Sequence, residues 1–473
     1  MPSIAIAWFR RDLRLADHPA LTAAIEAADI VVPVFVFDVP LLGGRFASAT
    51  RTWFMRESVA SLARDLEARG AGLRIATGRP LDVLPALARD TGATSVFVTR
   101  DAAPYGRRRD RAVAERLASD GVTMHAKRGL YVHEPDEVRT QDGRGFTVYS
   151  PFRRAWEAMP RRGVFPVPDR IPGDPSHTRS DPIPAVASPT ADIALIPAPG
   201  EAAARERLDR WVVGRVEAYA DSRNRIDAPD GTSRLSQDLR WGLLSPLEVV
   251  ERAAGAGEGR RVFVGEIAWR EFYAHVLWHH PGVLREPFQP AFAALEHARD
   301  DAALEAWAAG RTGYPVVDAA MRQLRASGYV HNRARMIAAS FLTKDLLLDW
   351  RLGEAEFMRH LTDGDVASNN GGWQWTASTG TDPQPYFRIF NPILQGKRFD
   401  PDGAYVRRWV PELAAVPAAR IHEPWTMTPL EQAESGIRIG VDYPAPIVDH
   451  AEARERALAA YSAARGDASP PSG

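Results

Sequence analysis

The stretch from residue 361 to 399 reads LTDGDVASNNGGWQWTASTGTDPQPYFRIFNPILQGKRF, and its composition sets it apart from the rest of the chain. Its small residues allow a ligand to approach the backbone closely. Trp373 and Trp375 are two positions apart, so we expect them to point to different faces of a helix. Two aspartates alone do not make a metal site, and because no third carboxylate or histidine stands at ligand spacing, we expect no bound metal. The residues that carry the chemistry of this stretch are Asp363, Asp365, Asn369, Asn370, Gly371, Gly372, Trp373 and Trp375.

Helical periodicity dominates the chain around this stretch, from about residue 201 to the C-terminus. Ten of the 13 tryptophans lie in this region. In residues 263–275, FVGEIAWREFYAH, an acid, an arginine and two aromatic residues recur at spacings of three and four, and therefore share one helix face. That face is either a functional surface or an ordinary amphipathic face in which Glu266 pairs with Arg270. The sequence alone leaves both interpretations open.

Further segments of the helical region suit a phosphate ligand. In GTSRLS, residues 231–236, the hydroxyl groups most simply cap the start of a helix, although the same geometry also forms an anion site. Residues 319–344 carry five basic and no acidic residues, and residues 388–408 carry five basic against two acidic residues. Such clusters are either solvated basic faces or contacts for a nucleic-acid backbone.

In the first 130 residues, short apolar runs rich in valine, isoleucine and phenylalanine alternate with helical patterns. This alternation predicts a parallel sheet covered on both faces, a Rossmann-like α/β fold that lacks the GxGxxG fingerprint of dinucleotide-binding domains. The proline-rich part of the chain that follows predicts a connector that wraps a surface. We place the α/β domain at 1–130, the interdomain linker at 131–200 and an all-α domain at 201–473. The expected strands are 3–9, 31–37, 73–76 and 95–99, and the clearest expected helices are 51–69, 80–90 and 449–465.

The composition excludes several classes of protein. The 473 residues include no cysteine, so disulfides, thiolate catalysis and cysteine-ligated metals are excluded. No apolar run reaches the ~18–20 residues that span a bilayer. The N-terminal apolar stretch precedes its basic cluster, which is the reverse of a secretory signal, so we expect a cytoplasmic protein without a membrane partner. The net charge of −1 argues on its face against a nucleic-acid partner, whereas the local basic segments argue for one.

Taken together, the motifs resemble the DNA photolyase/cryptochrome family over nearly the whole chain. WFRRDLRLADHPAL, GTSRLS, WREFY, TGYPVVDAAMRQL, HNRARM and DGDVASNNGGWQWTASTGTDPQPYFRIFNP occur in the family's order. The closest resemblance is to bacterial class I enzymes that repair cyclobutane pyrimidine dimers. The resemblance implies an α/β antenna domain, a helical domain that binds FAD, and a monomer that acts on ultraviolet-damaged DNA.

The resemblance also implies roles for individual residues. The family's flavin-binding positions are occupied by Tyr219, Thr232, Ser233, Arg234, Leu235, Ser236, Trp269, Arg270, Asn332, Arg335, Asp363, Asp365 and Asn369. The positions that contact DNA and the flipped-out dimer are occupied by Arg223, Glu266, Trp269, Asn332, Arg333, Met336 and Trp375. Reduced FAD, excited by light, would pass one electron to the dimer. Glu266 would donate or relay a proton, for which burial must raise its pKa.

A tryptophan relay that reduces oxidised flavin is a further implication of the resemblance. Trp373 and Trp350 match its first two members, and Asn369 occupies the position beside the reactive flavin nitrogen. The outermost position of the relay is occupied by His297, which is a poor electron donor compared with indole. Either the local register differs, or another residue such as Trp307 ends the relay, or photoreduction is slow.

The antenna and the exact activity stay open in the sequence. Arg51 and Asp101 fit a site for 8-hydroxy-5-deazaflavin, while Ala103 departs from that pattern. Methenyltetrahydrofolate and an empty antenna site are the alternatives. A cryptochrome-like blue-light photoreceptor and a (6-4) photolyase are the alternative activities. Asn369 and the short tail after the last helix favour repair over signalling, and Met336 with the tryptophan pair favours the cyclobutane dimer.

Overall fold

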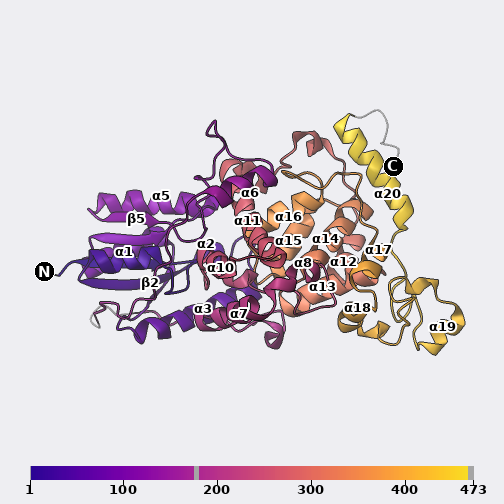
Figure 1. Ribbon diagram of the computed structural model, residues 1–473, viewed down its shortest axis with the longest axis horizontal. Helices are drawn as coiled ribbons and strands as arrows, with labels where there is room; N and C mark the ends of the chain where they lie inside the picture. The colour runs from indigo at the N-terminus through magenta and orange to yellow at the C-terminus, as the bar shows by residue number, and fades with distance from the viewer. Residues whose placement is uncertain (1, 175–179, 467–473) are drawn as a thin grey trace.

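The computed structural model describes residues 2–174 and 180–466, and the chain forms an α/β domain beside a helical domain (Figure 1). The α/β domain contains a parallel sheet of five strands, β1 (Ile4–Phe9), β2 (Ile30–Asp38), β3 (Arg74–Gly78), β4 (Ser95–Thr99) and β5 (Thr123–Lys127). Their order in the sheet is β3-β2-β1-β4-β5. In the central strand, Ile6 pairs with Val32 of β2 on one side and with Val96 of β4 on the other.

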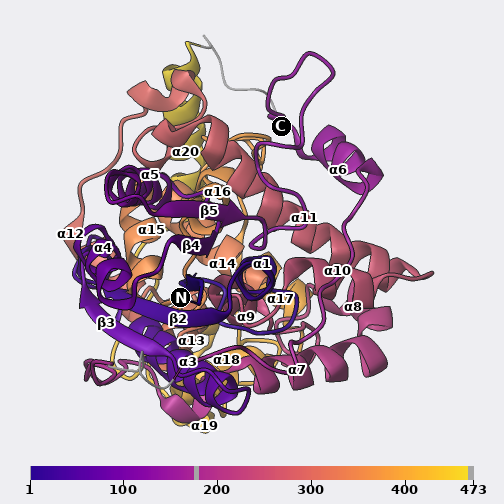
Figure 2. The same cartoon turned by 90° about the vertical axis from the view of Figure 1, so that its left-hand side faces the viewer.

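Helices cover both faces of this sheet, as the alternating pattern predicted (Figure 2). They are α1 (Pro19–Ala27), α3 (Ala49–Glu67), α4 (Pro80–Thr91) and α5 (Pro104–Ser119), and a short helix α2 (Val39–Leu42) follows β2. Ala5, Ala7 and Phe9 pack with α1 and α3 on one face, while Ile6 and Trp8 pack with α4 and α5 on the other. Because both faces are buried, β1 and β2 are continuous apolar runs.

Strand β5 is a strand that the apolar pattern does not predict. Its sequence, TMHAK, mixes polar and half-buried residues, and it lies at one edge of the sheet. An edge strand has a single neighbouring strand and is only partly covered, so its sequence needs no continuous apolar run.

The connector between the domains bonds to both of them. After α6 (Tyr149–Ala158), the described residues between 160 and 192 contain no helix or strand. The N–H of Ile171 donates to the carbonyl of Arg69 in the α/β domain, and the N–H of Asp192 donates to the carbonyl of Ala326 in the helical domain, both at 2.8 Å. These bonds satisfy backbone groups that a helix or sheet would otherwise pair. The connector therefore follows the surface, as its proline-rich composition predicts.

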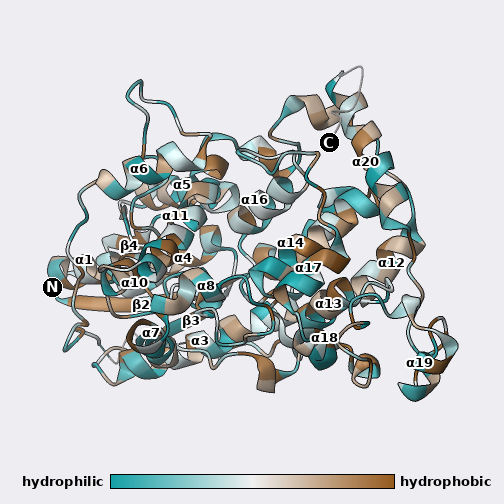
Figure 3. Ribbon diagram, turned by 45° about the vertical axis from the view of Figure 1, so that its right-hand side comes forward, coloured by the Kyte–Doolittle hydropathy of each residue, from teal (hydrophilic) through white to brown (hydrophobic). Residues whose placement is uncertain are grey.

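The helical domain surrounds an apolar core that includes Trp307, Trp350 and Trp373. Hydrophobic and hydrophilic residues alternate along its helices, which is the pattern of helices with one buried face (Figure 3). The expected last helix is confirmed, and the tail beyond it lies outside the described residues. The helices are α7 (Glu201–Gly214), α8 (Tyr219–Ser222), α9 (Ser236–Trp241), α10 (Pro246–Ala253), α11 (Glu258–His279), α12 (Asp301–Ala309), α13 (Pro315–Ser327), α14 (Asn332–Ser340), α15 (Trp350–His360), α16 (Val366–Thr376), α17 (Pro392–Phe399), α18 (Ala404–Trp409), α19 (Pro429–Glu434) and α20 (His450–Arg465).

Glycines bring α16 into close contact with α11 and α15. A Cβ atom added at Gly371 would lie 2.1 Å from Cδ1 of Tyr273 in α11, and one added at Gly353 of α15 would lie 2.1 Å from Cη2 of Trp373. A Cβ atom added at Gly372 would meet nothing within 4 Å. The sequence analysis expected the small residues of 361–399 to let a ligand approach the backbone. Gly372 has the open space that this requires, whereas Gly371 admits a neighbouring helix instead. Within residues 2–174 and 180–466, no helix is long and apolar enough to cross a membrane.

Replacing Gly371 by alanine should destabilise the fold, whereas the same change at Gly372 should not. The added methyl group at 371 has to displace Tyr273, and overpacking of this kind costs about 1–3 kcal/mol. At 372 the methyl group enters open space, and replacing a helical glycine by alanine stabilises a helix by about 1 kcal/mol. The free energies of unfolding in urea, measured without added flavin, check this. Equal values for the two variants would contradict the packing role of Gly371.

Candidate functional site

A cavity of about 470 Å³ lies between α9, α11, α14 and α16. Sites for small molecules typically measure ~300–1,000 Å³, so its volume suits a ligand. Most of the predicted flavin and dimer positions border it, while Arg333 and Trp350 are not among its lining residues. The predicted residues in the wall are Tyr219, Arg223, Thr232, Ser233, Arg234, Leu235, Ser236, Glu266, Trp269, Arg270, Asn332, Arg335, Met336, Asp363, Asp365, Asn369, Trp373 and Trp375.

Trp373 and Trp375 both border the cavity although they are two positions apart. The cavity therefore touches more than one face of α16, which agrees with the expectation that the two side chains point to different faces. The wall also contains residues that the sequence did not single out for ligand binding, among them Arg240, Tyr329 and Ser368. Helix packing brings these residues to the cavity, and no local sequence pattern predicts that packing.

The helix face shared by Glu266, Trp269, Arg270 and Tyr273 on α11 borders the cavity, so the functional interpretation of that face is supported. Trp269 stacks on Tyr149 with ring centroids 3.7 Å apart and an interplanar angle of 11°. This stacking restricts the orientation of the indole. Trp269 therefore presents a rigid aromatic surface beside the cavity.

The proposed pairing of Glu266 with Arg270 does not form. Oε1 of Glu266 lies 2.7 Å from Nη2 of Arg223, and both side chains are about one-third exposed, at 29% and 32%. Arg270 instead donates to the carbonyl oxygens of Leu130 at 3.0 Å and Leu239 at 3.4 Å. Burial raises the pKa of Glu266, and Arg223 opposes this rise. The direction is the one that the sequence analysis predicted.

The segment GTSRLS does not cap a helix with its hydroxyl groups, so that interpretation is wrong. Helix α9 begins at Ser236, its N-cap residue is Leu235, and no side chain caps it. Arg234 adopts a positive φ of 53° and its guanidinium lies 4.0 Å from the ring centroid of Tyr329. The positive φ turns the backbone away from a helical entry. The hydroxyl-bearing residues Thr232, Ser233 and Ser236 border the cavity, which favours the anion-site interpretation.

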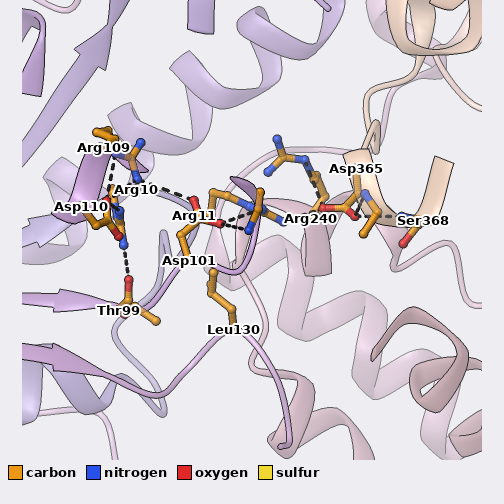
Figure 4. Close-up of polar contacts among 12 residues, drawn as sticks. Arg10, Arg11, Thr99, Asp101, Arg109, Asp110, Leu130, Arg240, Asp365 and Ser368 are labelled. Carbon is orange, nitrogen blue, oxygen red and sulfur yellow. Dashed lines mark hydrogen bonds and ion pairs between the residues drawn. The ribbon is translucent and has the colours of Figure 1, made fainter. Parts of the chain in front are cut away.

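An ion-pair chain joins the α/β domain to the start of α16 (Figure 4). Arg11, in the loop after β1, places Nη2 2.6 Å from Oδ2 of Asp365 and Nη1 3.6 Å from Oδ1 of Asp101. The other oxygen of Asp365 accepts from the N–H groups of Ala367 and Ser368, both at 3.1 Å. Burial alone would raise the pKa of Asp365, but Arg11 and neighbouring arginines lower it below its usual range. Asp365 is therefore an ionised N-cap.

Asp363 and Asn369 are held by different partners. Oδ2 of Asp363 accepts from Nη2 of Arg335 at 2.7 Å, while its Oδ1 is buried without a hydrogen-bond partner. Nδ2 of Asn369 donates to the carbonyl of Glu354 at 3.1 Å, so the amide oxygen points the other way. Both residues border the cavity.

The basic stretch 319–344 is not one continuous face, which corrects the expectation that it binds phosphates as a unit. Arg322 pairs with Glu412 at 2.7 Å and Arg335 pairs with Asp363. Lys344, in the π-helical turn Phe341–Asp345, is only 1% exposed. Its ammonium group donates to the carbonyl of Ala377 at 3.3 Å and to Oγ of Ser378 at 3.0 Å, and burial lowers its pKa.

Of the residues predicted for an electron relay, Trp373 and Trp350 lie in the core, whereas His297 is partly exposed. Trp373 is in edge contact with Trp307, with ring centroids 6.0 Å apart. Trp350, one helical turn before Gly353, is 1% exposed. Burial lowers the pKa of His297, and its Nδ1 is buried without a hydrogen-bond partner. Trp307 is thus a neighbour of Trp373 that a relay could use.

Of the predicted antenna residues, Arg51 contacts the helical domain, whereas Asp101 contacts arginines of its own α/β domain. Nη1 of Arg51 donates to the carbonyl oxygens of Met358 at 2.6 Å and Leu361 at 2.9 Å. Asp101 lies 3.6 Å from each of two arginine side chains. Neither Arg51 nor Asp101 borders the cavity. Their antenna role stays a prediction.

Comparisons with known proteins match both domains. Residues 5–172 match the family described as DNA photolyase, and residues 263–463 match the FAD binding domain of DNA photolyase. A deoxyribodipyrimidine photo-lyase of Agrobacterium fabrum is 40% identical over 97% of this chain and 98% of its own length. One from Halobacterium salinarum is 42% identical over 97% and 99%.

Solved structures show the same similarity. A bacterial class III photolyase from Agrobacterium tumefaciens superposes with a TM-score of 0.94 at 39% identity, covering 98% of both chains. A cryptochrome from Synechocystis superposes with a TM-score of 0.88 at 29% identity, covering 97% of this chain and 99% of its own.

An α/β domain joined by a connector to a helical domain that contains a ligand-sized cavity is the architecture of a two-domain protein that can hold a cofactor. The chain belongs to the DNA photolyase family, whose members carry out light-driven DNA repair, and its helical domain is an FAD-binding domain of that family. The wall fits such a cofactor, because Nε of Arg234, Nη1 of Arg240 and Oδ1 of Asp363 are buried without hydrogen-bond partners. Unpaired buried polar groups cost ~1–3 kcal/mol each, which a polar ligand can offset.

Lys344→Met should stabilise the fold increasingly as pH falls below about 10.5. The folded pKa of Lys344 lies well below its ordinary value of 10.5, so the unfolded chain binds a proton that the native chain does not. Falling pH therefore favours the unfolded state, and methionine removes this effect. Unfolding free energies at several pH values check it, with the exposed Lys397→Met as control. A difference from the parent that does not change with pH would show that Lys344 stays charged.

Proposed function

We propose that this chain splits cyclobutane pyrimidine dimers in DNA, using light and reduced FAD held in the cavity. The observation that carries the proposal is that one cavity is bordered by both the cofactor positions and the dimer positions. Asn369 and Asp363 border it, and so do Trp269, Trp375 and Glu266. A lesion that enters this cavity would therefore meet the cofactor directly.

Recognition of the dimer would rest on aromatic walls. A lesion inside a duplex has to be flipped out before it can reach a buried site. Trp269, held by its stacking on Tyr149, and Trp375 offer flat surfaces on the cavity. Stacking contributes about 1–3 kcal/mol per base. Asn332 and Met336, one turn apart on α14, add an amide and a polarisable sulfur to the same wall.

A small group of arginines would bind the flanking phosphates. Arg333 and Arg398 both lie over the ring of Phe399, at 4.6 Å and 5.2 Å from its centroid. Burial and the nearby Arg223 and Arg398 lower the pKa of Arg333, so the three cations are close to one another. Mutually repelling cations favour the arrival of phosphate groups. This group replaces the broad basic stretches as the proposed DNA contact.

Glu266 would control a proton at the dimer. When bound, reduced and light-excited FAD supplies the electron that opens the dimer. Glu266 currently pairs with Arg223. A phosphate that attracts Arg223 would remove this counter-charge, and burial would then favour the protonated carboxyl group. The Oε proton of Glu266 would stabilise negative charge on a dimer carbonyl oxygen.

Ultraviolet-irradiated DNA exposed to the chain with reduced FAD should lose cyclobutane dimers in blue light and not in the dark. Glu266→Gln should slow the loss at least about tenfold, because general-acid assistance typically contributes more than that. Glu258→Gln, at the exposed start of the same helix, should repair at the parent rate. No light-dependent loss, or loss confined to (6-4) photoproducts, would refute the proposed activity.

Trp373→Phe should abolish photoreduction of oxidised FAD while repair by chemically reduced enzyme continues. Trp373 borders the cavity and contacts Trp307, so it is the proposed first donor. Flavin absorption during illumination measures photoreduction, and Trp425→Phe, at a tryptophan that packs on Tyr314 instead, serves as the control. Photoreduction at the parent rate in Trp373→Phe would rule out this relay.

A further inference from the structure

Arg240 borders the cavity with a charge that is only weakly paired. Its Nε donates to the carbonyl of Gly364 at 2.8 Å, and its ion-pair contact with Asp365 is a long 4.0 Å. Its Nη1 is buried without a hydrogen-bond partner. Burial, together with the nearby Arg11, lowers the pKa of Arg240 to about 9. Arg240 is thus a largely buried cation, 14% exposed, without a close counter-ion.

The reason for this weak pairing lies in the other domain. Oδ2 of Asp365 is taken by Arg11 at 2.6 Å, and Oδ1 is taken by the first N–H groups of α16. Arg11 is only 15% exposed, and it is also 3.6 Å from Asp101. Asp365 and Asp101 raise the pKa of Arg11 although burial opposes them, so Arg11 stays charged. Oδ2 of Asp365 is therefore closely paired with Arg11, while Nε of Arg240 stays 4.0 Å from the same oxygen.

The cavity wall carries an excess of positive charge as a result. Arg270 also borders the cavity and bonds to backbone carbonyl oxygens, at Leu130 and Leu239. Buried cations without counter-ions are costly, and an anionic ligand offsets that cost. FAD carries a diphosphate that is anionic in every redox state of the flavin. The hydroxyl-bearing segment 231–236, which ends at the start of the helix that holds Arg240, borders the same cavity.

We infer that Arg11 is a positioning residue for the cofactor: it neutralises Asp365 from the α/β domain and so leaves Arg240 to face the diphosphate of FAD. Without Arg11, Arg240 is the cation nearest to Asp365 in the wall and can close the 4.0 Å gap. Arg240 would then pair with Asp365 and would no longer bind the diphosphate of FAD. The inference depends on FAD as the cofactor and not on which DNA lesion is repaired.

Release of FAD from the holoprotein tests this with a double-mutant cycle. Arg240→Gln and Arg11→Gln should each speed the release roughly three- to tenfold, which lies in the lower part of the range expected for coupling between neighbouring groups. The double variant should release FAD no faster than the faster single variant, because in Arg11→Gln the charge of Arg240 is already diverted. FAD fluorescence after dilution measures the release, and urea unfolding of each variant is measured alongside.

Arg100→Met is the matched control, because Arg100 also lies in the α/β domain and pairs with an aspartate, Asp136, at 2.8 Å. Its FAD release should equal that of the parent. If Arg11→Gln does not fold, Arg11→Lys replaces it in the double-mutant cycle. Lysine keeps the charge at a shorter reach, so the same pattern of FAD release is expected with smaller changes. If the fold-increase in FAD release of the double variant equals the product of the two single fold-increases, Arg11 and Arg240 act independently. That result would overturn the inference. Unchanged release in Arg11→Gln would also overturn it.

Discussion

The carboxylate of Asp365 is bonded from two domains at once. One oxygen caps the N-terminus of α16, and the other accepts from Arg11 in the α/β domain at 2.6 Å. Its lowered pKa keeps it ionised at ordinary pH, so the contact persists. Helix α16 carries Asn369 and Trp373 into the cavity wall. The same charge therefore contributes both to the contact between the domains and to the start of this helix.

Close packing of α16 against α11 and α15 determines the shape of the rest of the site. Gly371 and Gly353 let α16 approach α11 and α15 to distances that a methyl group would prevent. The helices then act as a rigid frame, and the cavity between them keeps polar groups unpaired on its wall. Such groups are costly in an empty protein and useful in one that holds a charged cofactor. The net charge of −1 hides this arrangement, because the arginines that matter are gathered around one cavity.

The sequence predicted what depends on local pattern. Apolar runs alternating with helical patterns predicted the parallel sheet, and spacings of three and four predicted the shared face of α11. The sequence did not predict edge strand β5, because this strand lacks an apolar run. The hydroxyl cap at residues 231–236 and the basic face containing Lys344 were wrong, because tertiary packing overrode both patterns. The pair of Arg11 with Asp365 spans 354 positions, and no local signal selects it among so many arginines.

A crystal structure of the chain with FAD bound tests the central claim most directly, since that claim concerns where the cofactor lies and what holds it. The account predicts FAD in the cavity, with its diphosphate beside Arg240 and residues 231–236, its flavin beside Asn369, and the Arg11–Asp365 pair intact. FAD bound elsewhere, or Arg240 bonded to Asp365 in place of Arg11, would contradict it.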